Sequence, residues 1–184
     1  DKMHVVVTGF TNHCSYVNHS GSLIVNAECE LMNRAHLTVQ YTFPYDTEET
    51  KFDCSGHLHA MPFMALNPIF EPITKVSFTD GMIDDMDFSF HAGENVATGE
   101  MKLAYKQLKV RFNLAQKTRQ KNQLITFIAH QVFIKEENPT GDKPLRITHI
   151  NFKREKEKFI FSYTLRSVLT GINEAILIKY GGKK

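Results

Sequence analysis

The chain has little cysteine and no long uninterrupted apolar run. Three cysteines in 184 residues are too few, and odd in number, for a disulfide framework. No stretch approaches the roughly 18 apolar residues of a membrane span, and the first residues lack the apolar core of a signal peptide. Cys29 and Cys54 fall on the apolar positions of expected strands, where a free cysteine behaves as a small hydrophobic side chain. The cysteines therefore do not fix the redox compartment.

Motifs for catalysis and for metal or cofactor binding are also missing. No G-x-S-x-G elbow and no glycine-rich phosphate loop occurs, so we predict no enzyme and no cofactor. Asp84, Asp85 and Asp87 form an acidic run without the glycine and glutamate of an EF-hand loop, and we interpret them as a solvated strand edge. His57 and His59 can pair on one face of a strand. Because the sequence fixes no third ligand near them, we predict no metal site.

Acidic and basic residues are divided unevenly along the chain. Residues 1–100 hold 4 of the 22 basic and 14 of the 20 acidic side chains, so the second half is basic. Such asymmetry can indicate an anionic partner, but no aromatic residues are interleaved as in a base-stacking surface. We predict a solvated face, or alternatively an anionic membrane surface, and no nucleic acid. The candidates for a membrane surface are Lys153, Arg154, Lys156 and Lys158.

Apolar and polar residues alternate almost without interruption over residues 82–114. A period of two indicates extended strands with one apolar and one polar face. The turn residues Gly93, Glu94 and Asn95 divide this segment into a long antiparallel hairpin. At Lys106 and Gln107 the apolar positions change from odd to even numbers, so we expect a bulge or bend there.

The same alternation recurs over residues 23–31, 37–43 and 52–60, with turns expected at 32–34 and 44–46. The apolar positions of all these strands define one inner face. Its larger side chains are our candidates for lining an apolar ligand groove: Leu37, Tyr41, Phe43, Phe52, Leu58, Met86, Phe88, Phe90, Met101, Leu103, Val110 and Phe112.

Three segments depart from the strand pattern and are predicted to form helices near 62–70, 121–134 and 160–178. The first is rich in proline and apolar, and should place Phe63, Leu66 and Phe70 against the sheet as a plug. A further strand is expected over 145–152. The last helix is amphipathic, and its predicted apolar stripe comprises Phe161, Leu165, Val168, Leu169, Ile172, Ala175 and Ile176.

These observations predict a β-rich α+β fold. We expect a curved antiparallel meander of about seven to nine strands with a hydrophobic inner face, covered or flanked by two to three helices. Residues 1–184 should form a single domain, with strand repeats over 1–120 and a helix-strand-helix cap over 121–184. Because Asp1 follows no initiator methionine, we expect a processed product or a fragment of a larger protein.

Several short segments occur together in an order that resembles the C-terminal region of AsmA-like (AsmA/TamB-type) envelope proteins of Bacteroidetes-type bacteria. They are LNPIFEP (66–72), VSFTDGMID (76–84), GEMKLAYKQLKV (99–110), AHQVFIK (129–135), NP (138–139), PLR (144–146), FKR (152–154) and SYTLRSVLTGI (162–172). The resemblance covers residues 50–178, and residues 1–49 carry no diagnostic motif.

The resemblance implies a periplasmic protein, anchored in the inner membrane through an N-terminal helix that this chain lacks, whose long β-sheet carries lipid along an apolar groove. It also implies a role in outer-membrane biogenesis or lipid transport, with lipid, anionic membrane or other envelope proteins as partners. A chain of 184 residues would form a short groove or its cap. The alternative is a structural or protein-interaction module whose core is closed by its own helices and holds no ligand.

Overall fold

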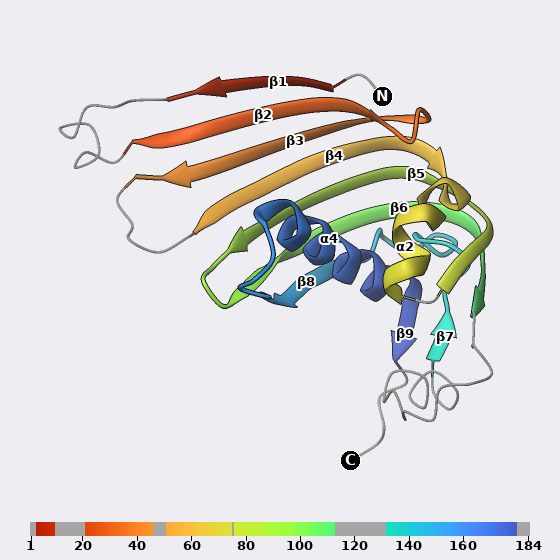
Figure 1. Cartoon of the computed structure of the whole chain (residues 1–184). Coiled ribbons are helices and arrows are strands. Elements are labelled where there is room, and N and C mark those ends of the chain that lie inside the picture. Colours follow the sequence, from red (N-terminus) through yellow and green to blue (C-terminus); the bar gives the residue numbers. More distant parts are fainter. Residues whose placement is uncertain (1–2, 10–20, 46–50, 75, 113–131, 180–184) are drawn as a thin grey trace, which may run out of the picture.

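A computed structural model describes residues 3–9, 21–45, 51–74, 76–112 and 132–179. It is an α+β fold in which a seven-stranded antiparallel sheet has the order β1-β2-β3-β4-β5-β6-β8. The strands are β1 (Met3–Thr8), β2 (Ser22–Leu31), β3 (Ala35–Pro44), β4 (Phe52–Pro62), β5 (Val76–Ala92), β6 (Val96–Phe112) and β8 (Ile147–Lys153). The predicted curved meander is confirmed, since β1 to β6 pair in chain order and arch together (Figure 1).

The predicted hairpin over 82–114 is confirmed by β5 and β6 as far as Phe112, where the described range ends, and the predicted turn at 32–34 joins β2 to β3. Met32 and Asn33 both have positive φ angles of 52°, which is the geometry of tight turns that match strand twist. One detail of β4 differs from the prediction. Ala60 is exposed and Met61 is buried, because the apolar positions change parity after Leu58.

The expected bend at Lys106 and Gln107 is also confirmed. Gln107 has a φ of 56°, and the pairing of β5 with β6 shifts register near Asp80. Across from the bend, Gly81 has a φ of 117°, and a Cβ there would lie 2.8 Å from the Cα of Leu108. Glycine is therefore required at this close approach of the two strands.

Two helical segments cover part of the inner face, which we define as the face that carries Tyr41, Phe90 and Ile150. The 3-10 helix η1 (Phe63–Leu66) and helix α2 (Asn67–Thr74) form the predicted plug: Phe63, Leu66 and Phe70 are buried. Helix α4 (Ile160–Ile176) packs on β6 and β8. No helix within these ranges is long and apolar enough to cross a membrane.

The predicted helix over 121–134 is wrong at its C-terminal end. Residues 121–131 lie outside the described ranges, and β7 (Val132–Ile134) is a strand. It pairs with β9 (Leu177–Lys179), so the last predicted helix ends two residues earlier than expected. In this small two-stranded sheet, β9 continues directly from the end of α4 (Figure 1).

The predicted stripe of α4 is wrong at its N-terminal end. Phe161 is 78% exposed and Leu165 is 38% exposed, whereas Tyr163, Ser167 and Gly171 are buried. The hydrophobic pattern alone overlooked this row, because serine and glycine are not hydrophobic and tyrosine carries a polar hydroxyl group. A Cβ on Gly171 would lie 2.9 Å from Met101 Cε, so the lack of a side chain lets the helix approach the sheet closely. The Ser167 hydroxyl is satisfied by donating to the Tyr163 carbonyl at 2.8 Å.

Candidate functional site

One cross-strand row runs along the inner face through all seven strands of the large sheet. Directly paired residues point to the same side of a sheet, and this row consists of Val7, Val25, Tyr41, Cys54, Phe90, Gly99 and Ile150. Val7 is 50% exposed, whereas Cys54 and Ile150 are 1% exposed. The inner face therefore changes from open to covered between β1 and β4.

The covered half of the sheet comprises β4, β5, β6 and β8. Most of the predicted groove residues lie in the hydrophobic core there or at its border: Tyr41, Phe52, Leu58, Met86, Phe88, Phe90, Met101 and Leu103 are all buried. Tyr163 of α4 contacts Phe52, with ring centroids 6.1 Å apart. Val110 is half-buried, and Phe112 ends β6, its side chain lying outside the described part.

The open half comprises β1, β2 and β3. Its inner positions are apolar on all three strands: Met3, Val5 and Val7 on β1; Leu23, Val25, Ala27, Cys29 and Leu31 on β2; Ala35, Leu37, Val39, Tyr41 and Phe43 on β3. Met3 is 69% exposed and Val5 is 45% exposed. Of the predicted groove residues, Leu37, Tyr41 and Phe43 lie here; Leu37 and Phe43 are half-buried, and Tyr41 is buried at the border with the covered half. The sequence analysis assigned no strand to β1, because Val5, Val6 and Val7 are consecutive apolar residues and do not alternate with polar ones.

Helix α4 reaches the open half at its first turn. The ring of Phe161 lies 6.5 Å from the ring of Tyr41, edge to face. Phe161 is nevertheless mostly exposed, as are Phe159 (86%) and Leu165. The exposed apolar side of α4 and the inner positions of β2 and β3 thus line one continuous apolar surface. Burial of Tyr41 at its border raises the pKa of the phenol, so this group stays neutral.

The four predicted membrane-surface residues lie at the end of β8 and in the connection to α4, close in sequence to Phe159. Lys153, Lys156 and Lys158 are exposed and Arg154 is half-buried. Lys156 Nζ lies 2.8 Å from Glu94 Oε1, and the Arg154 guanidinium lies 5.4 Å from the centre of the Tyr163 ring. Lysine and exposed phenylalanine thus occur together at this end of the molecule, but their binding to a membrane stays a prediction.

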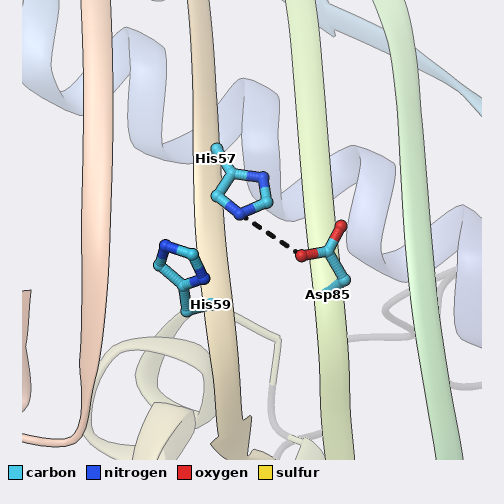
Figure 2. Close-up of side chains that lie close together, drawn as sticks. All are labelled: His57, His59 and Asp85. Carbon is cyan, nitrogen blue, oxygen red and sulfur yellow. Dashed lines mark ion pairs between the residues drawn. The ribbon is translucent and has the colours of Figure 1, made fainter.

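The outer face of the sheet is polar, and on it residues that are distant in the sequence lie close together. His57 and His59 of β4 lie beside Asp85 of β5 (Figure 2). The three aspartates 84, 85 and 87 were expected on a strand edge, but β5 is internal to the sheet. The sequence analysis did not place Asp85 near the two histidines. The pairing register of β4 with β5, which sets His59 opposite Asp85, is what brings them together.

The described residues offer one buried thiol, and its environment disfavours nucleophilic chemistry. Cys54 is 1% exposed, and burial raises the pKa of its thiol to about 12. At neutral pH the thiol therefore stays protonated, whereas a nucleophile must be a thiolate.

Comparison with protein-family models, with curated proteins and with solved structures finds no match.

Proposed function

We propose that this chain is a non-enzymatic domain that binds an apolar chain, such as the acyl chain of a lipid, on the inner face of its open half. The covered half would close one end of the groove, so the domain would act as a cap. The observation that carries this proposal is the apolar surface over β1, β2 and β3, which continues the core but keeps exposed side chains such as Val5 and Val7.

The exposed apolar side chains on the inner face of the open half support the proposal of a binding partner. Contiguous apolar patches on soluble proteins are typical of binding sites, and apolar burial stabilises a complex by roughly 25 cal/mol per Å². The strands β2 and β3 are 10 residues long each, or about 33 Å at 3.3 Å per residue. An elongated ligand fits this shape better than a compact one.

The cell envelope is the setting we propose, with a periplasmic location and an inner-membrane anchor outside this chain. The basis is the resemblance to AsmA-like proteins together with the exposed lysines beside Phe159 and Phe161. Basic residues are attracted to anionic lipid, and exposed aromatic side chains add apolar contact. A role in lipid transport or in outer-membrane biogenesis follows from the resemblance and is part of the proposal.

The alternative is a protein-interaction module with a closed core. Burial of Phe52, Met101 and Leu103 to 0% exposure favours it, because these candidates already have partners within the chain. Under this alternative the open half would pair with another protein surface and would take no lipid.

Two substitutions on one exposed strand separate these functions. Val5→Asp places a charge on the inner face of β1, and Val6→Asp places the same charge on the outer face. The two valines are similarly exposed, at 45% and 42%, so both variants should fold with similar stability. Binding of a fluorescent long-chain fatty acid to the full chain is then measured by titration, beside mass spectrometry of lipids extracted from the purified protein.

The proposal predicts saturable binding that Val5→Asp weakens by at least about tenfold, or about 1.4 kcal/mol, and that Val6→Asp leaves unchanged. A wild-type chain that neither carries extractable lipid nor binds the fatty acid would contradict the proposal and favour the interaction module. Equal loss in both variants would contradict the assignment to the inner face.

A further inference from the structure

The outer face carries a group of metal-ligating side chains that is independent of the apolar surface. His57, His59 and Asp85 each offer one ligand atom, and these three atoms lie within 4.8 Å of one another. Figure 2 shows the two imidazoles on β4 and the carboxylate on the neighbouring β5. Alternation along β4 places both histidines on one face, and the register places Asp85 opposite His59.

The position of His57 between two carboxylates favours a cation at this place. Its Nδ1 lies 2.8 Å from Asp87 Oδ1, and its Nε2 lies 3.3 Å from Asp85 Oδ1. A neutral imidazole has one N–H. When Nδ1 donates it to Asp87, the lone pair of Nε2 faces a carboxylate oxygen, and this contact is repulsive unless a proton or a metal ion lies between them.

We propose that His57 Nε2, an imidazole nitrogen of His59 and a carboxylate oxygen of Asp85 bind a first-row divalent transition ion of the zinc class. Two imidazoles and one carboxylate are ligands that such ions accept, whereas calcium and magnesium prefer oxygen alone. Asp87 is a positioning residue. It holds His57 through Nδ1 as the outer carboxylate does in carboxylate–histidine–zinc arrangements.

The geometry needs small adjustments that exposed side chains can make. Zinc bonds of about 2.0–2.1 Å separate tetrahedral ligand atoms by roughly 3.3 Å, so rotations of His59 and Asp85 bring the three atoms to bonding distance. The side chains of His57 and Asp85 are 33% and 47% exposed, which leaves a fourth coordination position to water. His57 and Asp87 also line a groove of about 670 Å³ across β2 to β6, so a polar molecule could replace that water.

The same two strands provide a matched control. His91 of β5 and Asp53 of β4 form a second pair, with Nδ1 and Oδ1 2.9 Å apart, and they are cross-strand neighbours. This pair has the same chemistry as His57 with Asp87 but no second imidazole in a metal-ligating group of the described residues. A general preference of zinc for exposed histidines would affect both places alike.

The test is a titration of Zn²⁺ into the chelator-treated full chain, in competition with a chromophoric chelator. Wild type, His59→Ala, Asp85→Asn, Asp87→Asn and His91→Ala are compared, and far-UV circular dichroism verifies that each variant is folded. A parallel Co²⁺ titration reports the ligands by absorption, since coordination by cysteine would add sulfur-to-cobalt charge transfer.

We expect one ion per chain and no sulfur band. His59→Ala and Asp85→Asn should lose the site, Asp87→Asn should weaken it by about 10–100-fold, and His91→Ala should bind as wild type does. Absence of binding by the wild type would overturn the proposal, as would equal affinity of His59→Ala and wild type. An effect of His91→Ala as large as that of His59→Ala, or a sulfur band, would also overturn it.

Discussion

The two halves of the sheet share one alternation but differ in what lies on their inner face. In the covered half, Phe52, Met101 and Leu103 are fully buried, and α4 packs against Phe52 and Met101. In the open half, Val5 and Val7 occupy equivalent inner positions and stay about half exposed. Alternation therefore decides which face of a strand is apolar, and the placement of the helices decides whether that face is core or surface.

The largest expected effect contrasts one phenylalanine from each half. Phe88→Ala should lower the free energy of unfolding by about 3–5 kcal/mol, because Phe88 is 5% exposed and its ring packs near Phe90. Phe43→Ala should lower it by about 1–2 kcal/mol, because the ring of Phe43 is half-buried. Urea unfolding of both variants measures the difference, and equal losses would remove the distinction between the halves.

Vesicle binding tests whether the basic residues that precede α4 attach this end of the molecule to an anionic membrane. Replacing Lys153, Arg154, Lys156 and Lys158 by glutamine should weaken binding to anionic vesicles by about 1 kcal/mol per residue. Replacing Lys102, Lys106 and Lys109 of β6 is the control. Co-sedimentation at low and high salt measures both. Equally negligible sedimentation on neutral and anionic vesicles would leave the four basic residues as a solvated turn.

The close packing of α4 can be disrupted at a single position. Gly171→Leu should destabilise the protein by about 1–3 kcal/mol, because the added atoms meet Met101 and Ile150. Gly171→Ala should cost less than Gly171→Leu, since a gain in helix propensity of up to about 1 kcal/mol partly offsets the contacts of the added Cβ with Met101 Cε at 2.9 Å and Ile150 Cγ1 at 3.0 Å. Thermal unfolding of the two variants checks this order. A stable leucine variant would mean that α4 does not pack closely here.

The smallest expected effect concerns an ion pair on the surface. Lys156 donates to Glu94 at 2.8 Å, and this hydrogen bond holds the pKa of Glu94 below its ordinary value of 4.5. Because the pKa of Glu94 is lower in the folded chain than in the unfolded chain, the ionised carboxylate stabilises the fold above pH 4.5. This stabilisation is lost as the pH falls through the lowered pKa of Glu94. Glu94→Gln should therefore shift the urea midpoint slightly at neutral pH and not at strongly acidic pH. A shift of equal size at both would exclude this pair as its cause.

The hairpin of β5 and β6, the bend at Gln107 and the plug around Phe63 could be predicted from the sequence, because each depends on residues that are close together in the chain. The α4 stripe was partly wrong because its packing depends on Ser167 and Gly171, which hydropathy does not mark as buried. The proximity of Asp85 to His57 and His59 was missed for a different reason. It depends on strand register, which no short motif encodes.

The most direct test of the central claim uses one cysteine from each half. Cys29 lies on the inner face of β2, opposite Met3 and Leu37, and is half-buried. Burial, together with Glu30, raises the pKa of its thiol, and Cys54 in the covered half is buried with a pKa of about 12.

Alkylation of the native full chain at mildly alkaline pH, followed by peptide mass spectrometry, measures both rates with and without a long-chain fatty acid. We expect Cys29 to react much faster than Cys54, and the fatty acid to slow Cys29 in proportion to its occupancy. A Cys29 rate that saturating fatty acid leaves unchanged would contradict ligand binding on the open half, and a Cys54 rate equal to that of Cys29 would contradict the difference between the two halves.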